Sequence, residues 1–191
     1  THLDVESLNR SGMGNVVLFY DKSFELTEGT DLRLTQGASL TIAENISEVF
    51  PTSATINGSI RIAGGNIVLQ SGTTVRLGAA GKLDVSGDVA GQYTAAGRTV
   101  TVDGGAISVE AAAVDIAEGA VLDVSGGAWL TTRSGKQTLK LGDAGEITLV
   151  NVGNDDLAAV DMRAYAAGSG GSLRIRTAAD IQIGGSMLAD P

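Results

Sequence analysis

The sequence predicts an all-β fold, a parallel β-helix (β-solenoid) with loop excursions, and three observations predict it. Short steps of the form apolar-x-apolar recur along almost the whole chain, many of them at intervals of eight residues. Glycine separates many of the steps and proline is rare, with 27 glycines against 2 prolines. No long window shows the 3.6-residue period of an amphipathic helix. This combination is typical of many short strands joined by tight turns.

The pattern is clearest in residues 65–87, GNIVLQSGTTVRLGAAGKLDVSG. Its three steps each begin eight residues after the previous one, and they are Ile67-x-Leu69, Val75-x-Leu77 and Leu83-x-Val85. Period-two alternation places the two apolar side chains of a step on one face of a strand and the middle side chain on the other. Gly72, Gly78 and Gly81 lie between the steps, and we expect them to supply the positive φ that a sharp corner requires.

The steps are grouped in blocks that start at residues 16, 60, 100 and 139, which gives a superperiod of about 40 residues. Parts of the blocks match residue for residue. The pentapeptide LDVSG occupies 83–87 and again 122–126, and a Gly-Gly pair occupies 64–65 and again 104–105. Two such matches in the same phase indicate internal duplication. Successive repeats are then expected to stack about 4.8 Å apart and to hydrogen-bond as parallel strands.

The sequence leaves two arrangements of the 40-residue unit open. The unit is either two coils of about 20 residues or one larger coil with an excursion loop. In the first arrangement the gaps conceal weaker strands, for which Ile56, Val89 and Leu130 are candidates. In both arrangements the predicted domain covers 15–191, preceded by an irregular segment, 1–14, that is a candidate cap for the first strands.

The alternation also predicts which side chains point inward. Leu83, Val85, Leu122 and Val124 are expected in the core, with the aspartates between them on the wet outer face. These aspartates are Asp84 and Asp123.

Composition argues against several classes of function. The net charge is −9, from 13 basic and 22 acidic residues, and the basic residues are scattered, so no phosphate-binding patch for nucleic acid is expected. No run of about 18 apolar residues offers a membrane span. His2 is the only histidine and cysteine is absent, so neither a nucleophilic triad nor a His- or Cys-based metal site has its residues. We therefore predict a non-enzymatic chain with no catalytic, cofactor-binding or metal residues.

Four aromatic residues are candidate ligand contacts because they fall in the gaps between steps. They are Phe50, Tyr93, Trp129 and Tyr165. Aromatic side chains on the loops of a rigid scaffold are common contact points for sugars and proteins. The alternative is that each of them covers the flank of the solenoid.

Four segments carry a resemblance to a known family. They are GMGNVVLFYDKSFELTEGTDLRLTQGASLTI, GGNIVLQSGTTVRLGAAGKLDVSG, AVLDVSGGAWL and GSGGSLRIRTAADIQIGG, within residues 12–185. This order resembles the repeat-rich region of filamentous-haemagglutinin-like exoproteins, which Gram-negative bacteria export by two-partner secretion. The resemblance implies a right-handed β-helix in a long extracellular filament, located in the secreted fraction or at the cell surface. It also implies an outer-membrane transporter as the partner of the full-length protein, and no catalytic residues.

The expected function is accordingly a structural stalk segment of a large secreted adhesin, as a fragment of a longer filament. A host receptor or a surface glycan is a possible further partner. One alternative is a glycan- or protein-binding module that uses the inter-strand loops. A second is a β-helix carbohydrate-active enzyme, whose mark would be a cleft lined by several acidic residues from stacked coils.

Overall fold

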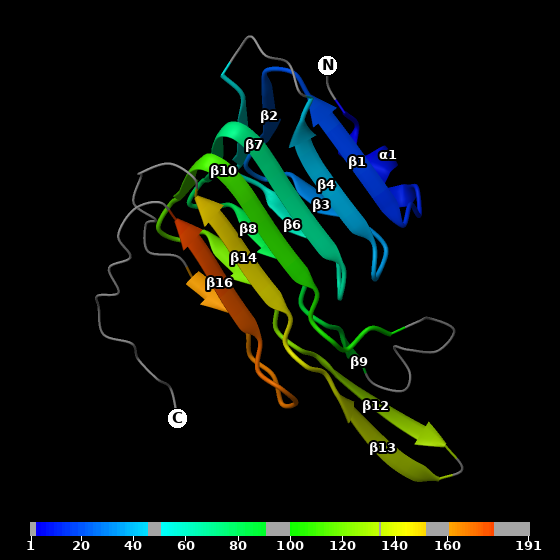
Figure 1. Ribbon diagram of the computed structural model, residues 1–191. Helices are drawn as coiled ribbons and strands as arrows, with labels where there is room; N and C mark the ends of the chain where they lie inside the picture. Colours follow the sequence, from blue (N-terminus) through cyan, green and yellow to red (C-terminus); the bar gives the residue numbers. More distant parts are fainter. Residues whose placement is uncertain (1–2, 46–50, 91–99, 134, 152–160, 178–191) are drawn as a thin grey trace.

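The computed structural model describes residues 3–45, 51–90, 100–133, 135–151 and 161–177. The described chain is mostly β, with one short helix, and its strands form three sheets (Figure 1). Sheet A has the order β1-β4-β7-β10-β14-β16, and β2 and β5 extend it beside β7. Sheet B, with the order β15-β11-β8-β6-β3, lies behind sheet A, and the small sheet C, β13-β12-β9, projects from one end of both.

The strands have the following bounds. Sheet A contains β1 (Asn15–Tyr20), β2 (Ser23–Leu26), β4 (Ser39–Glu44), β5 (Ser53–Ile56), β7 (Asn66–Leu77), β10 (Ala106–Ile116), β14 (Glu146–Asn151) and β16 (Ser172–Thr177). Sheet B contains β3 (Asp31–Arg33), β6 (Ser59–Arg61), β8 (Lys82–Asp84), β11 (Val121–Asp123) and β15 (Asp161–Arg163). Sheet C contains β9 (Val89–Ala90), β12 (Ala128–Arg133) and β13 (Lys136–Leu141). Every pair in sheets A and B is parallel.

The chain alternates between the sheets, so strands from successive repeats become neighbours. In sheet A, Ala106 pairs with Asn66 on one side and with Glu146 on the other, and each partner is forty residues away. From β7 to β14 a repeat therefore contributes one strand to each main sheet, with an excursion into sheet C. The spacing is shorter elsewhere: Asn15 pairs with Ser39 and Ser39 with Asn66, 24 and 27 residues apart. Neither of the two predicted arrangements therefore holds for the whole described chain. The predicted weaker strands are present, since Ile56, Val89 and Leu130 lie in β5, β9 and β12.

The apolar core lies between sheets A and B. Ile67, Ile107 and Ile147 are partners in adjacent strands of sheet A, and all three are buried. Leu83 and Leu122 form the matching pair in sheet B and are fully buried, as predicted. Full burial of one such aliphatic side chain contributes roughly 1.5–3 kcal/mol. The in-register columns therefore join each repeat to the next.

The glycines of the central stretch have a different role from the one predicted. None of Gly72, Gly78 and Gly81 has a positive φ. Instead, Gly81 lies against the backbone of the neighbouring repeat, where a Cβ would lie 2.5 Å from the carbonyl oxygen of Ile56. At positions 72 and 78 the nearest atoms are the ends of the Glu44 and Asn57 side chains, which can move aside. Stacking rather than turn geometry therefore requires glycine at position 81.

Residues 1–14, expected to be irregular, contain the helix α1 (Val5–Arg10). Asp4 caps it by accepting a hydrogen bond from the backbone N–H of Glu6 at 3.1 Å. Asn9 then pairs with the edge strand β3: its amide donates to the carbonyl of Asp31 at 2.9 Å, and its oxygen accepts from the N–H of Arg33 at 2.7 Å. The predicted cap is confirmed for sheet B, because Asn9 satisfies backbone groups that an open edge would expose.

One step of the predicted pattern is placed differently. Leu139-x-Leu141 was expected to belong to the solenoid, but it lies in β13, which pairs antiparallel with β12. Both leucines are exposed, at 57% and 42%. The step pattern reports alternation along a strand and not which sheet the strand joins. Among the described residues, no helix is long and apolar enough to cross a bilayer.

Candidate functional site

The structure describes two of the four predicted contact residues, and Phe50 and Tyr93 lie outside the described residues. Trp129 is in β12 and is half-buried. Tyr165 follows β15, and its side chain is exposed, at 74%. The backbone of Tyr165 reaches the base of sheet C, where its N–H donates to Ser125 Oγ at 3.1 Å and its carbonyl accepts from Gly126 N at 2.7 Å. The backbone of Tyr165 is therefore bonded to the residues that directly precede β12, the strand that contains Trp129.

Trp129 has an unusual polar environment. Its indole Nε1 is buried and has no hydrogen-bond partner among the described residues. A buried N–H without a partner costs about 1–3 kcal/mol relative to a paired one. Burial of the N–H is compatible with the alternative that Trp129 covers the flank of the sheets, so its role as a ligand contact stays a prediction.

Sheet A carries two open grooves that the sequence did not predict. The larger, of about 660 Å³, runs over the carboxyl ends of β1 and β4 and the middle of β7 and β10. Its walls include Phe19 on one side and Gln70 and Glu110 on the other, with Ala43 between them. The hollow follows from the small side chain of Ala43 in a column of larger residues, a signal visible only once the strand register is known.

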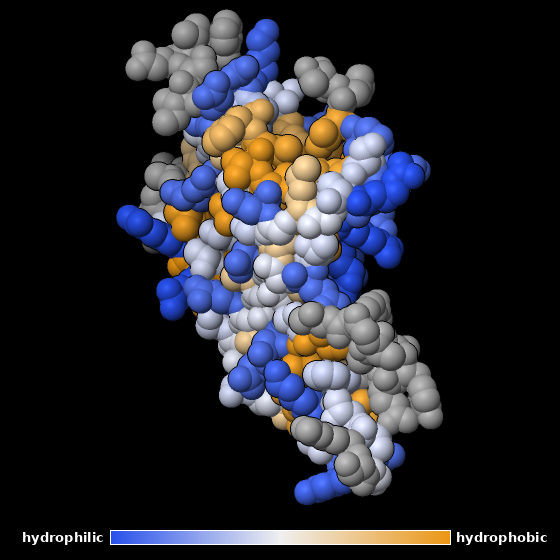
Figure 2. Space-filling model, turned by 90° about the vertical axis from the view of Figure 1, so that its right-hand side faces the viewer, coloured by the Kyte–Doolittle hydropathy of each residue, from blue (hydrophilic) through white to orange (hydrophobic). Residues whose placement is uncertain are grey.

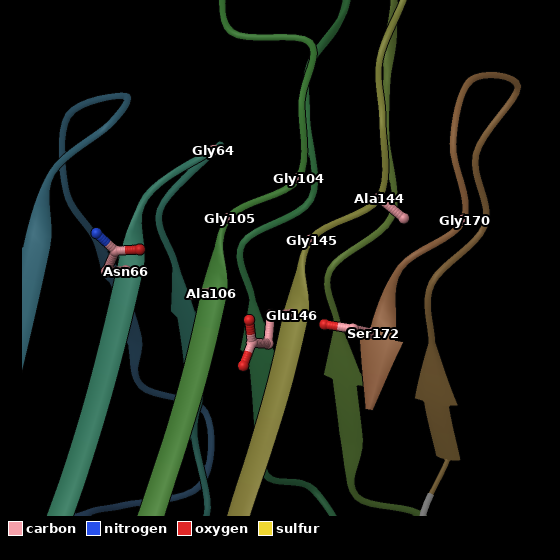
Figure 3. Close-up of a pocket in the computed structure, with 10 residues that line it drawn as sticks. All are labelled: Gly64, Asn66, Gly104, Gly105, Ala106, Ala144, Gly145, Glu146, Gly170 and Ser172. Atoms are coloured by element: carbon pink, nitrogen blue, oxygen red, sulfur yellow. The ribbon is translucent and has the colours of Figure 1, made fainter. Parts of the chain in front are cut away.

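The second groove, of about 470 Å³, lies where the strands of sheet A begin (Figure 3). Half of its lining residues are glycines, namely Gly64, Gly104, Gly105, Gly145 and Gly170. The carboxylate that faces it, on Glu146, already accepts from Thr148 Oγ1 at 3.0 Å and pairs with Arg174 at 3.3 Å. This groove therefore offers shape but few free polar groups.

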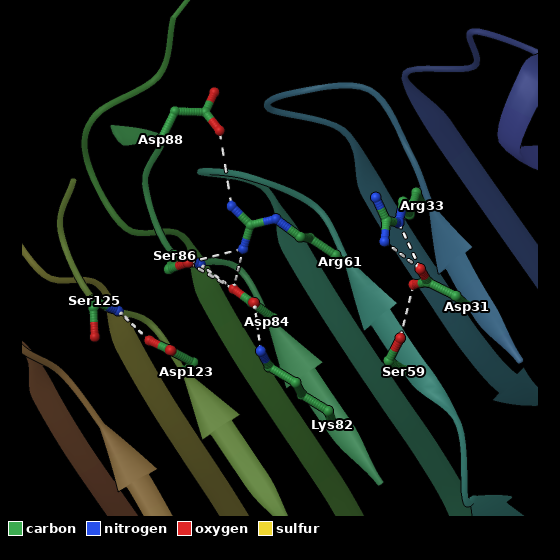
Figure 4. A network of polar contacts seen from close by, with 10 residues as sticks. All are labelled: Asp31, Arg33, Ser59, Arg61, Lys82, Asp84, Ser86, Asp88, Asp123 and Ser125. Carbon is green, nitrogen blue, oxygen red and sulfur yellow. Dashed lines mark hydrogen bonds and ion pairs between the residues drawn. The ribbon is translucent and has the colours of Figure 1, made fainter. Parts of the chain in front are cut away.

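The densest polar cluster is on the outer face of sheet B (Figure 4). Asp84 contacts Arg61 Nη1 at 2.5 Å, Lys82 Nζ at 3.0 Å and Ser86 Oγ at 2.6 Å. Asp84 points away from the apolar core, as predicted, but only 6% of the residue is exposed. The expectation of a wet outer position was wrong for Asp84, because the long side chains of Arg61 and Lys82 cover it. Asp123, its partner in β11, is half-buried.

The environment of Asp84 shifts its pKa. Burial alone raises the pKa, but the hydrogen bonds from Ser86 and Lys82 and the charge of Arg61 outweigh it, so the net pKa is below the ordinary value. The ionised form is therefore favoured in the folded chain.

This shift predicts acid sensitivity. A carboxylate whose pKa is depressed by folding stabilises the fold above its ordinary pKa of about 4, and the contribution is lost as the pH falls through the native pKa. We expect Asp84→Asn to lower the unfolding free energy at neutral pH by about 1–3 kcal/mol and to flatten its decline below about pH 4. Urea titrations from pH 7 to pH 2 measure both effects.

Asp115→Asn is the control for that experiment, because Asp115 pairs with Arg76 at 3.3 Å but both side chains are more than half exposed. An exposed pair contributes about 0–1 kcal/mol. Equal effects of the two substitutions would contradict a special role for Asp84.

The described residues offer little for catalysis or metal binding. No group of three or more His, Cys, Asp or Glu side chains within them is placed to hold a metal ion. In the sheet B cluster, Asp84 is paired with Arg61 and Lys82. The larger groove brings two carboxylates, on Glu44 and Glu110, from separate strands, and Glu44 is engaged by the hydroxyl of Thr52.

Comparison of the chain with protein-family models, with curated proteins and with solved structures found no match. The support for a function therefore comes from the chain itself.

Proposed function

We propose that the chain is a right-handed parallel β-helix that serves as a structural stalk segment of a large secreted bacterial adhesin. The observation that carries this proposal is the in-register stacking of equivalent residues from successive repeats. Ile67, Ile107 and Ile147 occupy one column at intervals of forty residues. A stack in which each repeat contacts only its neighbours extends in one dimension, and its length is set by the number of repeats. Length and rigidity are what a stalk requires.

The distribution of exposed apolar residues supports continuation of the stack. Phe19 and Val17 are exposed on β1, at one edge of sheet A, and Leu173 is exposed on β16, at the other edge. Figure 2, which views the molecule from the β1 side, shows apolar side chains gathered on that face. An edge strand with uncovered apolar side chains favours addition of a further strand, and the β16 edge is the one that α1 does not cap.

The resemblance of residues 12–185 to filamentous-haemagglutinin-like repeats supports the biological setting. It implies a protein that an outer-membrane transporter exports and that remains at the cell surface or is released. The absence of cysteine agrees with export of an unfolded chain, in which a disulfide formed early would obstruct passage.

Duplication of one repeat tests the proposal. Insertion of a second copy of residues 66–105 after position 105 is expected to give a longer, cooperatively folded chain. Its urea m-value should rise in proportion to the added length, since m follows the surface exposed on unfolding. Small-angle scattering should show growth along one axis only. Loss of cooperative unfolding, or isotropic growth, would contradict an extendable stalk.

The function itself requires an attachment assay. The native chain and the duplicated chain are each placed between a membrane anchor and a receptor-binding head on a non-adherent bacterium. We expect both to support attachment, and the longer one to keep it when the surface coat is thicker. A chain that promotes attachment without the head would instead act as the adhesive element.

The buried Nε1 of Trp129 favours a second candidate, a glycan- or protein-binding module. This N–H lacks a partner among the described residues but is buried, so a ligand hydroxyl or carbonyl would pair with it only after the indole turned outward. We expect Trp129→Ala to reduce any glycan-array signal at least tenfold, while Tyr165→Ala reports whether the neighbouring aromatic contributes. An empty array for the native chain, together with blue-shifted Trp129 fluorescence, would contradict the binding module and leave the structural stalk as the proposed function.

A further inference from the structure

The hairpin formed by β12 and β13 differs from the rest of the molecule in charge and in exposure. Residues 128–141 contain 3 of the 13 basic residues and none of the 22 acidic ones. The hairpin projects away from sheets A and B (Figure 1). A basic arm is attracted to the acidic groups of a second copy, so a pairing of two arms needs such groups beside the hairpin to offset the repulsion between the lysines.

One face of sheet C is apolar and exposed. Leu130 pairs with Leu139, and Ala128 pairs with both Leu141 and Val89. Partners in adjacent strands share a face, as do alternate residues of one strand, so these five residues lie on the same side of the sheet. The four large ones have exposed fractions from 37% for Leu130 to 84% for Val89. We call this set the leucine face.

The strand β13 is also an edge. Among the described residues it pairs with β12 alone, which leaves the backbone groups on its other side unpaired. An exposed edge of six residues beside an apolar face is the arrangement that promotes strand addition. The lysines that ordinarily protect such an edge, at 136 and 140, alternate with Leu139 and Leu141, so they lie on the opposite face.

We propose that the chain forms a weak symmetric dimer by antiparallel pairing of β13 with β13 of a second copy, with the two-fold axis at Leu139. This register joins the two leucine faces, because Leu139 lies opposite its own copy and Leu141 lies opposite Gln137. Each Lys140 then faces Thr138, and each Lys136 faces Gly142. Axes through Thr138 or Lys140 would place lysines opposite each other, and directly opposed like charges destabilise a strand pair.

The same register brings the hairpin tip to acidic groups of the second copy. Lys136 of one copy faces Gly142 of the other. It therefore lies beside Asp143 of that copy, which follows Gly142 and is exposed. The backbone N–H of Asp143 donates to the carboxylate of Asp103 at 3.1 Å, so two carboxylates are close together there. Two six-residue strands bury less than the roughly 1,200 Å² of a stable interface, so we expect a low affinity for a single pair of chains. If the chain is a stalk segment, as proposed above, several copies aligned on neighbouring stalks would bind each other more tightly through avidity.

Single-cysteine crosslinking tests the register, because the chain has no cysteine of its own. Paired residues in an antiparallel sheet have Cα atoms about 4.5–5.5 Å apart, which suits a disulfide. Under mild oxidation of the full chain, we expect Leu139→Cys to give mostly covalent dimer, in a yield that falls on dilution. Lys140→Cys should give at least tenfold less, because it faces Thr138 of the other copy. Equal yields, or a monomeric Leu139→Cys, would overturn the proposal.

Sedimentation equilibrium of cysteine-free chains provides the second measurement. The native chain should show concentration-dependent dimer that weakens at high salt. Lys136→Glu should raise the dissociation constant about tenfold, since it places a carboxylate beside Asp103 and Asp143 of the second copy. Lys140→Glu makes the same charge change opposite a threonine and should have a clearly smaller effect. A native chain that stays monomeric at millimolar concentration, or that binds phosphatidylglycerol vesicles through the hairpin without dimerising, would overturn the proposal.

Discussion

Replacing Gly105 with alanine is expected to lower the free energy of unfolding by about 3–5 kcal/mol, near the upper end for a single substitution. Gly105 stacks directly on Gly65, and a Cβ at position 105 would collide with the carbonyl oxygen of Gly65. That oxygen accepts the hydrogen bond from the N–H of Ala106 at 2.9 Å, while Gly105 N donates to Val85 at 2.9 Å. The strands therefore cannot separate to admit a methyl group without breaking bonds on both sides.

Gly170→Ala is the matched control, because it adds the same methyl group at the same corner of the stack. A Cβ at position 170 would meet nothing within 4 Å, and the backbone there does not have a positive φ. Urea denaturation followed by circular dichroism should show a change of less than about 0.5 kcal/mol. If the two alanines had equal effects, the close approach of the repeats would not be what requires glycine at position 105.

Leu122→Ala is expected to cost about 2–5 kcal/mol, the range for truncation of a buried leucine. Leu122 is fully buried in β11, between Leu83 of β8 and Met162 of β15. Truncation leaves a cavity that spans the contact between two repeats, and the rigid ladders on both sides prevent collapse into it. The loss should appear as a lower urea midpoint with an unchanged m-value.

The adjacent Asp123→Ala separates the effect of the core from that of the strand. Asp123 is half-buried, and its carboxylate accepts from the N–H of Ser125 at 3.0 Å. Loss of that bond should cost about 0.5–1.5 kcal/mol. Comparable losses at positions 122 and 123 would contradict the inward and outward assignment of this strand.

Alternation was sufficient to predict which residues form the core. Leu83, Val85, Leu122 and Val124 are all fully buried, because period-two patterning determines the face of a strand wherever that face is enclosed. Internal duplication likewise predicted that Asp84 and Asp123 would be neighbours, and they are paired in register. Both features depend on residues close together in sequence or related by the repeat.

Features that depend on the partner strand were not predictable. The two LDVSG segments are identical in sequence, yet Asp84 is buried and Asp123 is not. The difference arises because Lys82 and Arg61 flank Asp84, whereas Val121 takes the place of Lys82 beside Asp123. The groove beside Phe19 and the exposed face of Leu139 have the same origin, since each depends on which strands become neighbours.

The charged residues on the outer face of sheet B also disfavour one error in strand assembly. The apolar column of sheet B consists of interchangeable aliphatic side chains, so by itself it would accept the strands in a wrong sequence, a known failure of repetitive chains. The outward column has, in order, Arg33, Arg61, Asp84, Asp123 and Arg163, which gives two like-charge and two opposite-charge steps. In the native order Arg61 meets Asp84 and Asp123 meets Arg163, whereas omission of β8 and β11 would leave three arginines in a row with no carboxylate between them. A chain with all five positions neutralised should therefore populate that skipped pairing more often during refolding.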